Sequence, residues 1–539
     1  MRLGYEGPAH MNLPANIAAV RDLLTERAMT AAELQPALRE QGIVISATRL
    51  ETLPDKYPEV FHRDASGRLT VHTLKFDDTD EPDDETEAVH DDVPPWLLTA
   101  PPEPLELNEL VVLVSEVSGD VTNVGYVRLS DGRASCLADD GHLVAALKSA
   151  TDGVGGVVCF GSTWSTHPLA GPLHQLGLPV IDLRLLALLD APSRPRTTFG
   201  DLCVDLQVRL GDGGLLDQAR AAADCLRLLL DRLDPADPSW RLAYACLVAG
   251  QNDLARLLTR VPLPDHPTSG LRCAPDPLLV PPTESAEAFA STNAWEPGAR
   301  AAVRHVFANL DRLGFAPRRQ QREVSQAIAE TIDGGSRLAI EAPTGTGKTL
   351  AYLAPAVGRA ARARRPVIVA TATKVLQQQI RRDVGRLQAA GLFPAPFRQI
   401  FGVNNYICTR EVAGHLEEGS PSTPAELWTA LAVAARALST SGSGAWDDVM
   451  DSDLVQRLPG YRISRDTLRT DSASCERRRC AWAAHCPLMS RTVGIQDDPG
   501  VVSVNHALLA TWAAQAWQGV RAPGDILAEG GPDLIFDEA

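Results

Sequence analysis

Hydrophobic residues recur at helical spacing near the start of the chain. The pattern predicts helices over residues 14–27 (PANIAAVRDLLTER) and 31–41 (AAELQPALREQ), with Thr30 as the N-cap of the second. A third helix is expected near residues 46–53, followed by a hairpin over residues 60–72 (VFHRDASGRLTVH). Three short helices and a hairpin indicate a winged-helix-like domain. Its third helix carries few basic residues, so contact with DNA and docking to another protein both stay open.

The pattern changes to mixed strands and helices from residue 108 onwards. Apolar runs predict two strands joined by a tight turn at residues 108–119 and 123–133, and a third strand at residues 155–161. A further apolar stretch follows at residues 178–189. A long helix over residues 215–233 keeps an apolar stripe through Ala219, Ala223, Leu226 and Leu230. These elements predict a second, α/β domain.

A glycine-rich loop then lies between an expected strand, residues 338–340, and an amphipathic helix. This order is typical of a phosphate-binding loop, here EAPTGTGKT. Gly345 and Gly347 let backbone amides turn toward phosphates, and Lys348 supplies a positive charge to the β and γ groups. Upstream, GFAPRRQQREV carries a side-chain amide that can read adenine. The predicted ATP-binding residues are Gln321, Arg322, Thr344, Gly345, Thr346, Gly347, Lys348 and Thr349.

A short apolar strand, LIF, delivers two carboxylates at its end, Asp537 and Glu538. Asp537 and Thr349 are predicted to hold Mg²⁺, and Glu538 is predicted to orient and deprotonate the attacking water. With Lys348, these two carboxylates are the predicted catalytic residues.

Charge and hydropathy narrow the class of protein. The net charge of −17 disfavours a surface that coats nucleic acid, although a local basic track is compatible with it. Ten carboxylates and no Lys or Arg lie in residues 77–92, which indicates a solvated linker. No run of about 18 apolar residues and no secretory signal is present, so we expect a cytoplasmic protein without a membrane partner.

The ten cysteines fall into two groups. Six are scattered singly among apolar neighbours and are expected to be small buried residues. Cys475, Cys480 and Cys486 form C-x4-C-x5-C, with Cys408 upstream. In a reducing compartment this spacing favours a metal site over disulfides. Zinc and buried free thiols stay as alternatives, because structural zinc ligands are usually paired more closely.

Two further segments predict contacts with nucleic acid. VIVATATKVLQQQI runs from a strand into a helix start rich in hydroxyls and amides, which suit sugar–phosphate contacts. An arginine run lies inside the cysteine loop, where it can meet phosphates, balance a cluster or form an ordinary solvated surface. The predicted DNA-binding residues are Thr371, Thr373, Gln377, Arg477, Arg478 and Arg479.

The order of these motifs resembles the iron–sulfur helicases of superfamily 2, the DinG and XPD relatives, and DinG most closely. FAPRRQQRE, EAPTGTGKT, TATKVLQQQ, FGVNNYICTR, the cysteine spacing, VVSVNHALL and LIFDEA occur in the family's order. Asn505 and His506 match its NHxL element. The resemblance implies ATP, Mg²⁺ and a [4Fe–4S] cluster on Cys408, Cys475, Cys480 and Cys486. It also implies movement 5′ to 3′ on single-stranded DNA and opening of forks or R-loops.

The second domain resembles the proofreading-type 3′–5′ exonuclease frame, which is RNase H-like. That family holds two metal ions with four carboxylates. Here three acidic positions fall on Val114, Ser165 and Gln218, the general-base histidine falls on Gly213, and only Glu116 is retained. One carboxylate cannot hold two divalent ions, so this domain is expected to be an inactive exonuclease.

The expected architecture is therefore α/β and multidomain. It comprises a leader or cloning scar at 1–11, a winged-helix-like domain at 12–74, an acidic linker at 75–107, a degenerate exonuclease domain at 108–262, a linker at 263–297, and a first RecA-like lobe at 298–539 with an iron–sulfur insert about 403–495. The expected function is the N-terminal part of an ATP-dependent DNA helicase of repair or replication. Because the resemblance implies a second motor lobe after LIFDEA, the isolated chain is expected not to unwind. The alternatives are an ATP-independent nucleic-acid-binding platform and a helicase coupled to an active 3′–5′ exonuclease.

Overall fold

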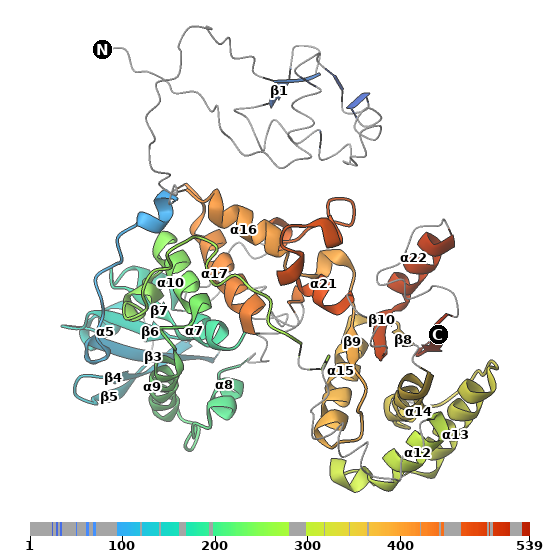
Figure 1. The fold of residues 1–539 in the computed structure, drawn as a ribbon. Helices are drawn as coiled ribbons and strands as arrows, with labels where there is room; N and C mark the ends of the chain where they lie inside the picture. The colour runs from blue at the N-terminus through green and yellow to red at the C-terminus, as the bar shows by residue number, and fades with distance from the viewer. Residues whose placement is uncertain are drawn as a thin grey trace, which may run out of the picture. The chain divides into compact units, whose positions relative to one another are not determined.

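The computed structural model of the chain describes most of residues 94–538 and a few positions before them. The described residues are 24, 29–30, 33–34, 50, 61–63, 68–71, 94–118, 121–138, 142–160, 169–192, 198–276, 278–279, 298–316, 318–343, 345–363, 366–420, 422–440, 444–446, 465–492, 495, 500–517 and 531–538. They form two compact units: Met1–Asp92 with Asp471–Glu476, and Val93–Thr470 with Arg477–Ala539. Figure 1 shows the ribbon, and each unit is described by itself.

In the smaller unit, β1 (Phe61–Arg63) pairs with β2 (Leu69–Val71) in antiparallel register, which confirms the predicted hairpin. Thr30 also caps as predicted, since its hydroxyl accepts from the amide of Glu33 while the Glu33 carboxylate accepts from the amide of Thr30. Most of the three predicted helices lies outside the described residues. The winged helix therefore stays a prediction.

The first sheet of the larger unit has five strands in the order β5-β4-β3-β6-β7. β4 pairs antiparallel with β5 on one side and with β3 on the other. β6 pairs parallel with β3, and β7 pairs parallel with β6. Their bounds are β3 Leu110–Ser118, β4 Val121–Arg128, β5 Ala134–Ala138, β6 Gly156–Cys159 and β7 Val180–Asp182. The strands predicted at 108–119, 123–133 and 155–161 are confirmed, whereas the short β5 was not predicted.

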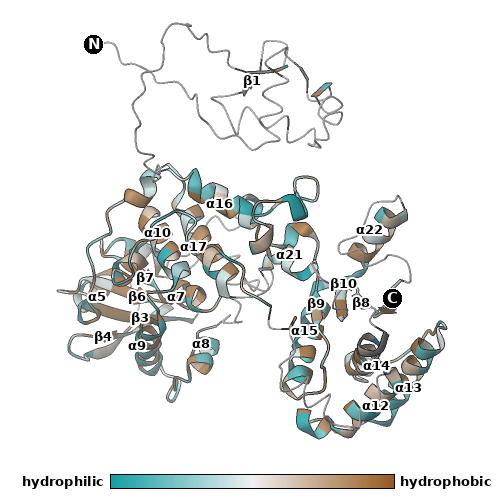
Figure 2. Cartoon of the chain, viewed as in Figure 1, coloured by the Kyte–Doolittle hydropathy of each residue, from teal (hydrophilic) through white to brown (hydrophobic). Residues whose placement is uncertain are grey.

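Alternate residues of β3 serve two cores, because successive side chains of a strand point to opposite faces. Val112 packs with the core that includes α9, and Val111 and Leu113 pack with the core of α5. Figure 2 shows the apolar character of these strands. The helices are α5 Leu143–Ala150, α6 Ala170–His174, α7 Leu183–Asp190, α8 Phe199–Leu206, α9 Leu215–Arg232 and α10 Pro238–Ala249. The predicted helix at 215–233 is thus confirmed.

The second sheet has four parallel strands in the order β11-β8-β10-β9. Their bounds are β8 Val367–Thr371, β9 Phe397–Gln399, β10 Val501–Asn505 and β11 Asp533–Phe536. Val367 and Val369 face one core, and Ile368 and Ala370 face the other. Burial on both faces is the usual condition of a parallel sheet.

Helices cover this sheet and extend the lobe. They are α12 Ala299–Ala308, α13 Arg319–Gly334, α14 Lys348–Ala363, α15 Lys374–Ala389 and α22 His506–Trp517. The described helices between β9 and β10 include α16 Thr409–Glu417, α17 Ala425–Thr440 and α21 Pro487–Thr492. None of the described helices is long and apolar enough to cross a membrane.

The strand predicted at residues 338–340 is wrong. These residues lead into the phosphate loop, but no strand is assigned to them. Leu338 and Ile340 are 47% and 40% exposed, and no described strand hydrogen-bonds to them. An apolar run becomes a strand only when a neighbour accepts its backbone bonds.

Helix α17 packs against the first sheet's helices rather than against the RecA-like sheet. Its residues join α7 and α10 in one core. The buried Arg436 donates to the carbonyl of Leu189 at 2.9 Å, to Asp237 at 2.8 Å and to the hydroxyl of Ser239 at 2.6 Å. Its guanidinium also lies 4.3 Å from the ring centroid of Trp240. Helix α17 therefore joins the segment between β9 and β10 to the first sheet and its helices, β3 to α10, which we call the middle domain.

Candidate functional site: a phosphate loop and a cysteine segment

The phosphate loop has the backbone that its glycines predict. Gly345 and Gly347 have φ of +80° and +77°, a region that side chains other than glycine rarely adopt. The side-chain amide of Gln321 donates to the carbonyl of Gly347 at 2.9 Å, and Arg318 donates to the carbonyl of Gly345 at 2.5 Å. Gln321 thus braces the loop from α13. Thr344 lies outside the described residues.

Helix α14 begins at Lys348, so its N-terminal amides and this lysine lie at the same end. That end of a helix carries a partial positive charge and favours phosphate groups. Thr346 stabilises the loop through a hydrogen bond from its hydroxyl to the carbonyl of Pro343 at 2.9 Å. Arg322 is exposed on the first turns of α13.

The side chain of Tyr352, one turn into α14, connects the two predicted Mg²⁺ ligands. Its hydroxyl donates to Asp537 at 3.0 Å. The side chain of Thr349 lies beside the same hydroxyl and acts on its pKa. Burial and the charge of Asp537 raise the pKa of Tyr352, so the hydroxyl keeps its proton and its role as donor. Sequence reasoning missed this residue because a tyrosine at a helical core position reads as packing.

Strand β11 brings Asp537 to this place. It pairs in parallel with β8, and the amide of Asp537 donates to the carbonyl of Ala370 at 2.8 Å. An ion pair at its other end, Arg359 to Asp533 at 2.6 Å, fixes β11 against α14. Glu538 follows with an exposed side chain and a left-handed φ of +58°. Thr349 and Asp537 both place oxygen atoms beside the hydroxyl of Tyr352. Mg²⁺ prefers oxygen ligands, so these two side chains fit a magnesium site.

The segment predicted to contact DNA divides into interior and surface residues. Thr371 is buried and donates to the carbonyl of Thr373 at 3.1 Å, and Gln377 is buried and donates to the carbonyl of Ile400 at 3.3 Å. Thr373 is exposed and caps α15 through a bond from the amide of Leu376. The side chains of Thr371 and Gln377 therefore make hydrogen bonds in the protein interior in this conformation. DNA contact stays a prediction, carried by Thr373 and the first amides of α15.

Asn505 and His506 stand where β10 turns into α22. The carboxamide oxygen of Asn505 accepts from the amide of Leu508 at 2.8 Å, which caps the helix. The ring of His506 lies 3.1 Å from the carbonyl of Ala370 and 6.0 Å from the ring of Phe536. This pair therefore joins β10 to the strands that carry the candidate site.

The structure places three of the four predicted cluster cysteines in the larger unit. Cys408 caps α16, Cys480 follows the arginine run, and Cys486 precedes α21. The hydroxyl of Thr409 donates to the carbonyl of His485 at 2.9 Å, which joins the segments of Cys408 and Cys486. Cys475 belongs to the segment grouped with the smaller unit. Among the described residues, no three His, Cys, Asp or Glu side chains are arranged to hold a metal ion.

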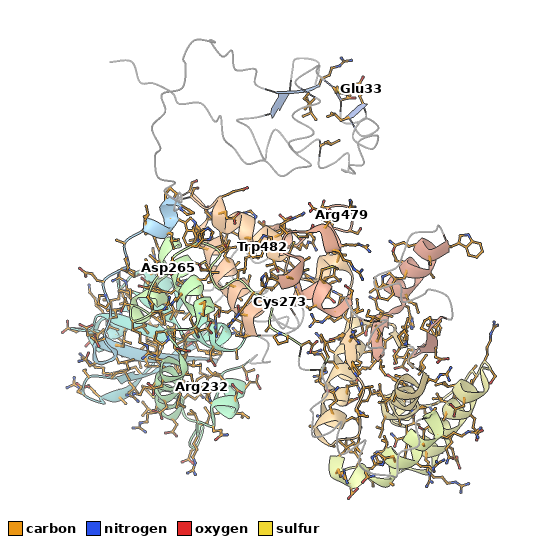
Figure 3. The ribbon with its side chains drawn as sticks, viewed as in Figure 1. Glu33, Arg232, Asp265, Cys273, Arg479 and Trp482 are labelled. Carbon is orange, nitrogen blue, oxygen red and sulfur yellow. The ribbon has the colours of Figure 1, made fainter. Side chains whose placement is uncertain are left out.

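Thiol groups of this segment influence one another. Burial raises the pKa of Cys408 to about 12, and the nearby Cys486 adds to the rise. Burial likewise raises the pKa of Cys273 to about 11, again with a contribution from Cys486. Cys273, which Figure 3 labels, was expected to be one of the scattered structural cysteines, and its pKa nevertheless responds to Cys486. A bound metal would displace these protons, because thiolates are the ligands.

The arginine run lies on the surface beside these cysteines. Arg477 has a φ of +54°, and Arg478 and Arg479 are exposed. Figure 3 labels Arg479 and Trp482. Trp482 lies 6.1 Å from the ring of His485. An exposed arginine run next to an aromatic residue is compatible with contact to a nucleic-acid backbone.

Three of the positions that the exonuclease resemblance assigns lie on described strands and helices. Val114 and the exposed Glu116 are on β3, and Gln218 is on α9. The side chain of Gln218 donates to the carbonyl of Gly213 at 3.0 Å. Ser165 lies outside the described residues.

Comparison with known proteins agrees with this site. Residues 319–396 match the DEAD/DEAH box helicase family. Three curated relatives are similar: DinG helicases of Mycobacterium tuberculosis (33% identical; 37% of this chain, 31% of the relative), Salmonella choleraesuis (34%; 36% and 28%) and Escherichia coli (32%; 36% and 28%). The chain thus spans about 30% of the length of the curated relatives it matches. A solved POL domain of Pol1 from M. smegmatis covers 52% of this chain and 43% of its own, with 18% identity and a TM-score of 0.20, too low to indicate a shared fold.

The four-stranded parallel sheet and the phosphate loop thus occur in the lobe whose residues 319–396 match the DEAD/DEAH box helicase family. Over about a third of its length the chain is similar to DinG helicases, which confirms the resemblance predicted from its motifs.

Proposed function

We propose that the chain binds Mg–ATP and single-stranded DNA as the first motor lobe of an ATP-dependent DNA helicase. The observation that carries the proposal is the shared hydroxyl of Tyr352, which joins Thr349 of the phosphate-loop helix to Asp537 at the end of β11. In P-loop enzymes the equivalent pair holds the metal ion that bridges the β and γ phosphates. The relatives are named ATP-dependent helicases, which supports the same reaction here.

Each residue has a defined part in this proposal. Lys348 and the first amides of α14 bind the β and γ phosphates. Gln321 and Arg318 stabilise the loop by hydrogen bonds to its backbone carbonyls. Asp537 and Thr349 would hold Mg²⁺, which neutralises charge on the transferring group. Glu538, next along the chain, accepts the proton of the attacking water. DNA passes the start of α15 near Thr373.

We further propose that Cys408, Cys475, Cys480 and Cys486 hold a [4Fe–4S] cluster. The nearness of Cys408 and Cys486 supports this proposal. A cluster binds each thiolate through a different iron, so its ligands lie farther apart than the ligands of a single metal ion. The cluster would pin the surrounding loops together. Arg477, Arg478 and Arg479 would then face DNA phosphates beside it. Translocation 5′ to 3′, forks or R-loops as substrates, and a role in repair belong to the same proposal.

The middle domain is proposed to be an inactive, RNase H-like exonuclease frame. Its support is the strand order β5-β4-β3-β6-β7, with three antiparallel strands followed by two parallel ones. Val114 and Gln218 stand at two of its acidic positions. A domain that keeps this frame without its carboxylates serves as a scaffold, and α17 packs on it.

Nucleotide binding tests the proposal. Lys348→Ala removes the charge that pairs with the phosphates, and loss of such a pair costs about 2 kcal/mol or more, which is about 30-fold in affinity. Lys374→Ala is the matched control, since Lys374 also begins a helix after a turn in the same lobe. Fluorescent ATP titrated into each variant should show weak binding only for Lys348→Ala. Equal binding by both variants would refute the assignment of the loop.

A further inference from the structure

The side chain of Asp276 lies in the connector between the middle domain and the RecA-like lobe and is completely buried. Arg381 of α15 binds both of its oxygens, at 2.8 and 2.9 Å. Arg491 of α21 binds one of them at 3.0 Å. The amide of Leu278 donates a fourth bond at 3.1 Å. One carboxylate therefore joins three segments that are far apart in the sequence.

The partners of Asp276 are held in place themselves. Arg491 is 2% exposed, donates to the carbonyl of Pro487 at 2.9 Å and lies 5.9 Å from the ring centroid of Tyr406. The side chain of Arg381 is 18% exposed. Two guanidinium groups meet at one anion in a place where water has little access. Without the carboxylate, these two positive charges would face each other with no compensating charge.

The same connector holds the elements around it. The amide of Ala274 donates to the carbonyl of Leu438 in α17 at 2.8 Å, and the amide of Phe397 in β9 donates to the carbonyl of Leu278 at 2.9 Å. The thiol of Cys273 donates to the carbonyl of Ala274 at 3.5 Å and lies beside Ser490 of α21, which acts on its pKa. The described residues 273–276 and 278 thus contact α17, α21, α15 and β9 within one short stretch. Among these contacts, only Asp276 carries charge to two helices at once.

The two helices joined by Asp276 carry different parts of the proposed site. α21 begins directly after Cys486, and α15 begins directly after Thr373. Bidentate pairing of an arginine with a carboxylate fixes direction as well as distance. The position of α21 relative to α15 is therefore set by one side chain that belongs to neither helix.

We propose that Asp276 is a positioning residue that holds the cysteine segment in register with the DNA-facing start of α15. The inference rests on the proposed function, because it assigns DNA contact to these two places. Asp276 touches neither DNA nor nucleotide. Its effect on DNA reaches the site through Arg381 and Arg491.

The test compares Asp276→Asn with Asp237→Asn in the full chain, prepared without oxygen. Both substitutions keep side-chain shape and remove one carboxylate that binds arginine, but Asp237 is 26% exposed, caps α10 and contacts α17 rather than α15 or α21. Binding of a fluorescent single-stranded oligonucleotide, binding of fluorescent ATP, and hydrogen exchange of each helix are measured for both. Asp276→Asn should weaken DNA binding about 5-fold or more, as expected for loss of coupling between sites, and leave ATP binding unchanged. Asp237→Asn should leave both unchanged.

Hydrogen exchange separates the inference from the function beneath it. Asp276→Asn should speed exchange in α15 and α21 together, and Asp237→Asn should speed it in α10 and α17. If the unmodified chain binds neither ATP nor single-stranded DNA, the proposed function fails, and exchange still decides whether Asp276 links the helices. Unchanged exchange in α15 and α21, or unchanged DNA affinity in Asp276→Asn beside a binding wild type, would overturn the inference.

Discussion

Replacing Arg436 by alanine should weaken the packing of α17 against α7 and α10. The guanidinium donates to Leu189, Asp237 and Ser239, and it stacks on Trp240. Removal leaves the carbonyl of Leu189 and the carboxylate of Asp237 without this donor. Breaking a buried charge pair costs about 3–5 kcal/mol. The side chain of Asp237 is 26% exposed and can recover water, so the lower end of that range, about 3 kcal/mol, applies here.

Thermal unfolding followed by circular dichroism measures this cost. A loss of about 3 kcal/mol lowers the midpoint of a 150–250-residue domain by about 6–12 °C. Arg232→Ala is the control, since Arg232 and Asp190 form a surface pair at 3.9 Å with 42% and 15% exposure. Such a pair contributes about 1 kcal/mol at most. Equal midpoints for Arg436→Ala and Arg232→Ala would refute the reasoning.

The same ion pair predicts a pH dependence. Burial raises the pKa of Asp237, but hydrogen bonds from Ser239 and the charge of Arg436 outweigh it, so the pKa falls below its usual 3.8. A lowered folded pKa adds stability that is complete above the unfolded pKa and is lost as the pH falls through the folded value. The difference in midpoint between wild type and Arg436→Ala should therefore be full at neutral pH and shrink only below about pH 4.

Three further changes test the site. Tyr352→Phe removes the hydroxyl between Thr349 and Asp537. Because a hydrogen bond to a charged group contributes about 1.5–3 kcal/mol, ATP binding in Mg²⁺ should weaken by about 10-fold. ATP binding in EDTA should be unchanged, and an equal loss in both conditions would contradict this prediction. Gly347→Ala forces a left-handed residue against the amide of Gln321 and should abolish nucleotide binding, whereas Gly334→Ala, with open space around it, should not. Cys408→Ala and Cys486→Ala should each lose most bound iron by elemental analysis, and Cys273→Ala should keep it; iron retained by all three would remove the cysteine assignment.

Local patterns predicted the elements that carry the site. The 3.6-residue stripe predicted α9 and the helix after the phosphate loop, and apolar runs predicted β3, β4, β6, β8 and β11. Glycine positions in the loop followed from the backbone that phosphate binding requires, and their positive φ values agree. These features depend on neighbours within a few residues, which is why a single sequence reveals them.

Contacts between distant segments left no such signal. Arg436 is the one basic residue in the mostly apolar helix α17, and its partner Asp237 lies about 200 positions away. Asp276 sits in a proline-rich connector and reads as an ordinary loop residue. The run at 338–340 fails as a strand for a related reason, because its partner is not set by its own apolar pattern. Tyr352 shows the converse case, a core position whose hydroxyl finds its acceptor 185 residues later.

The most direct test of the account is calorimetric titration of ATP into wild type and Asp537→Asn, with Mg²⁺ and with EDTA. If Asp537 and the phosphate loop converge on one Mg–nucleotide, Mg²⁺ should strengthen binding to wild type, and Asp537→Asn should bind with the same affinity in both buffers. An Asp537→Asn protein that gains as much affinity from Mg²⁺ as wild type does would contradict that convergence.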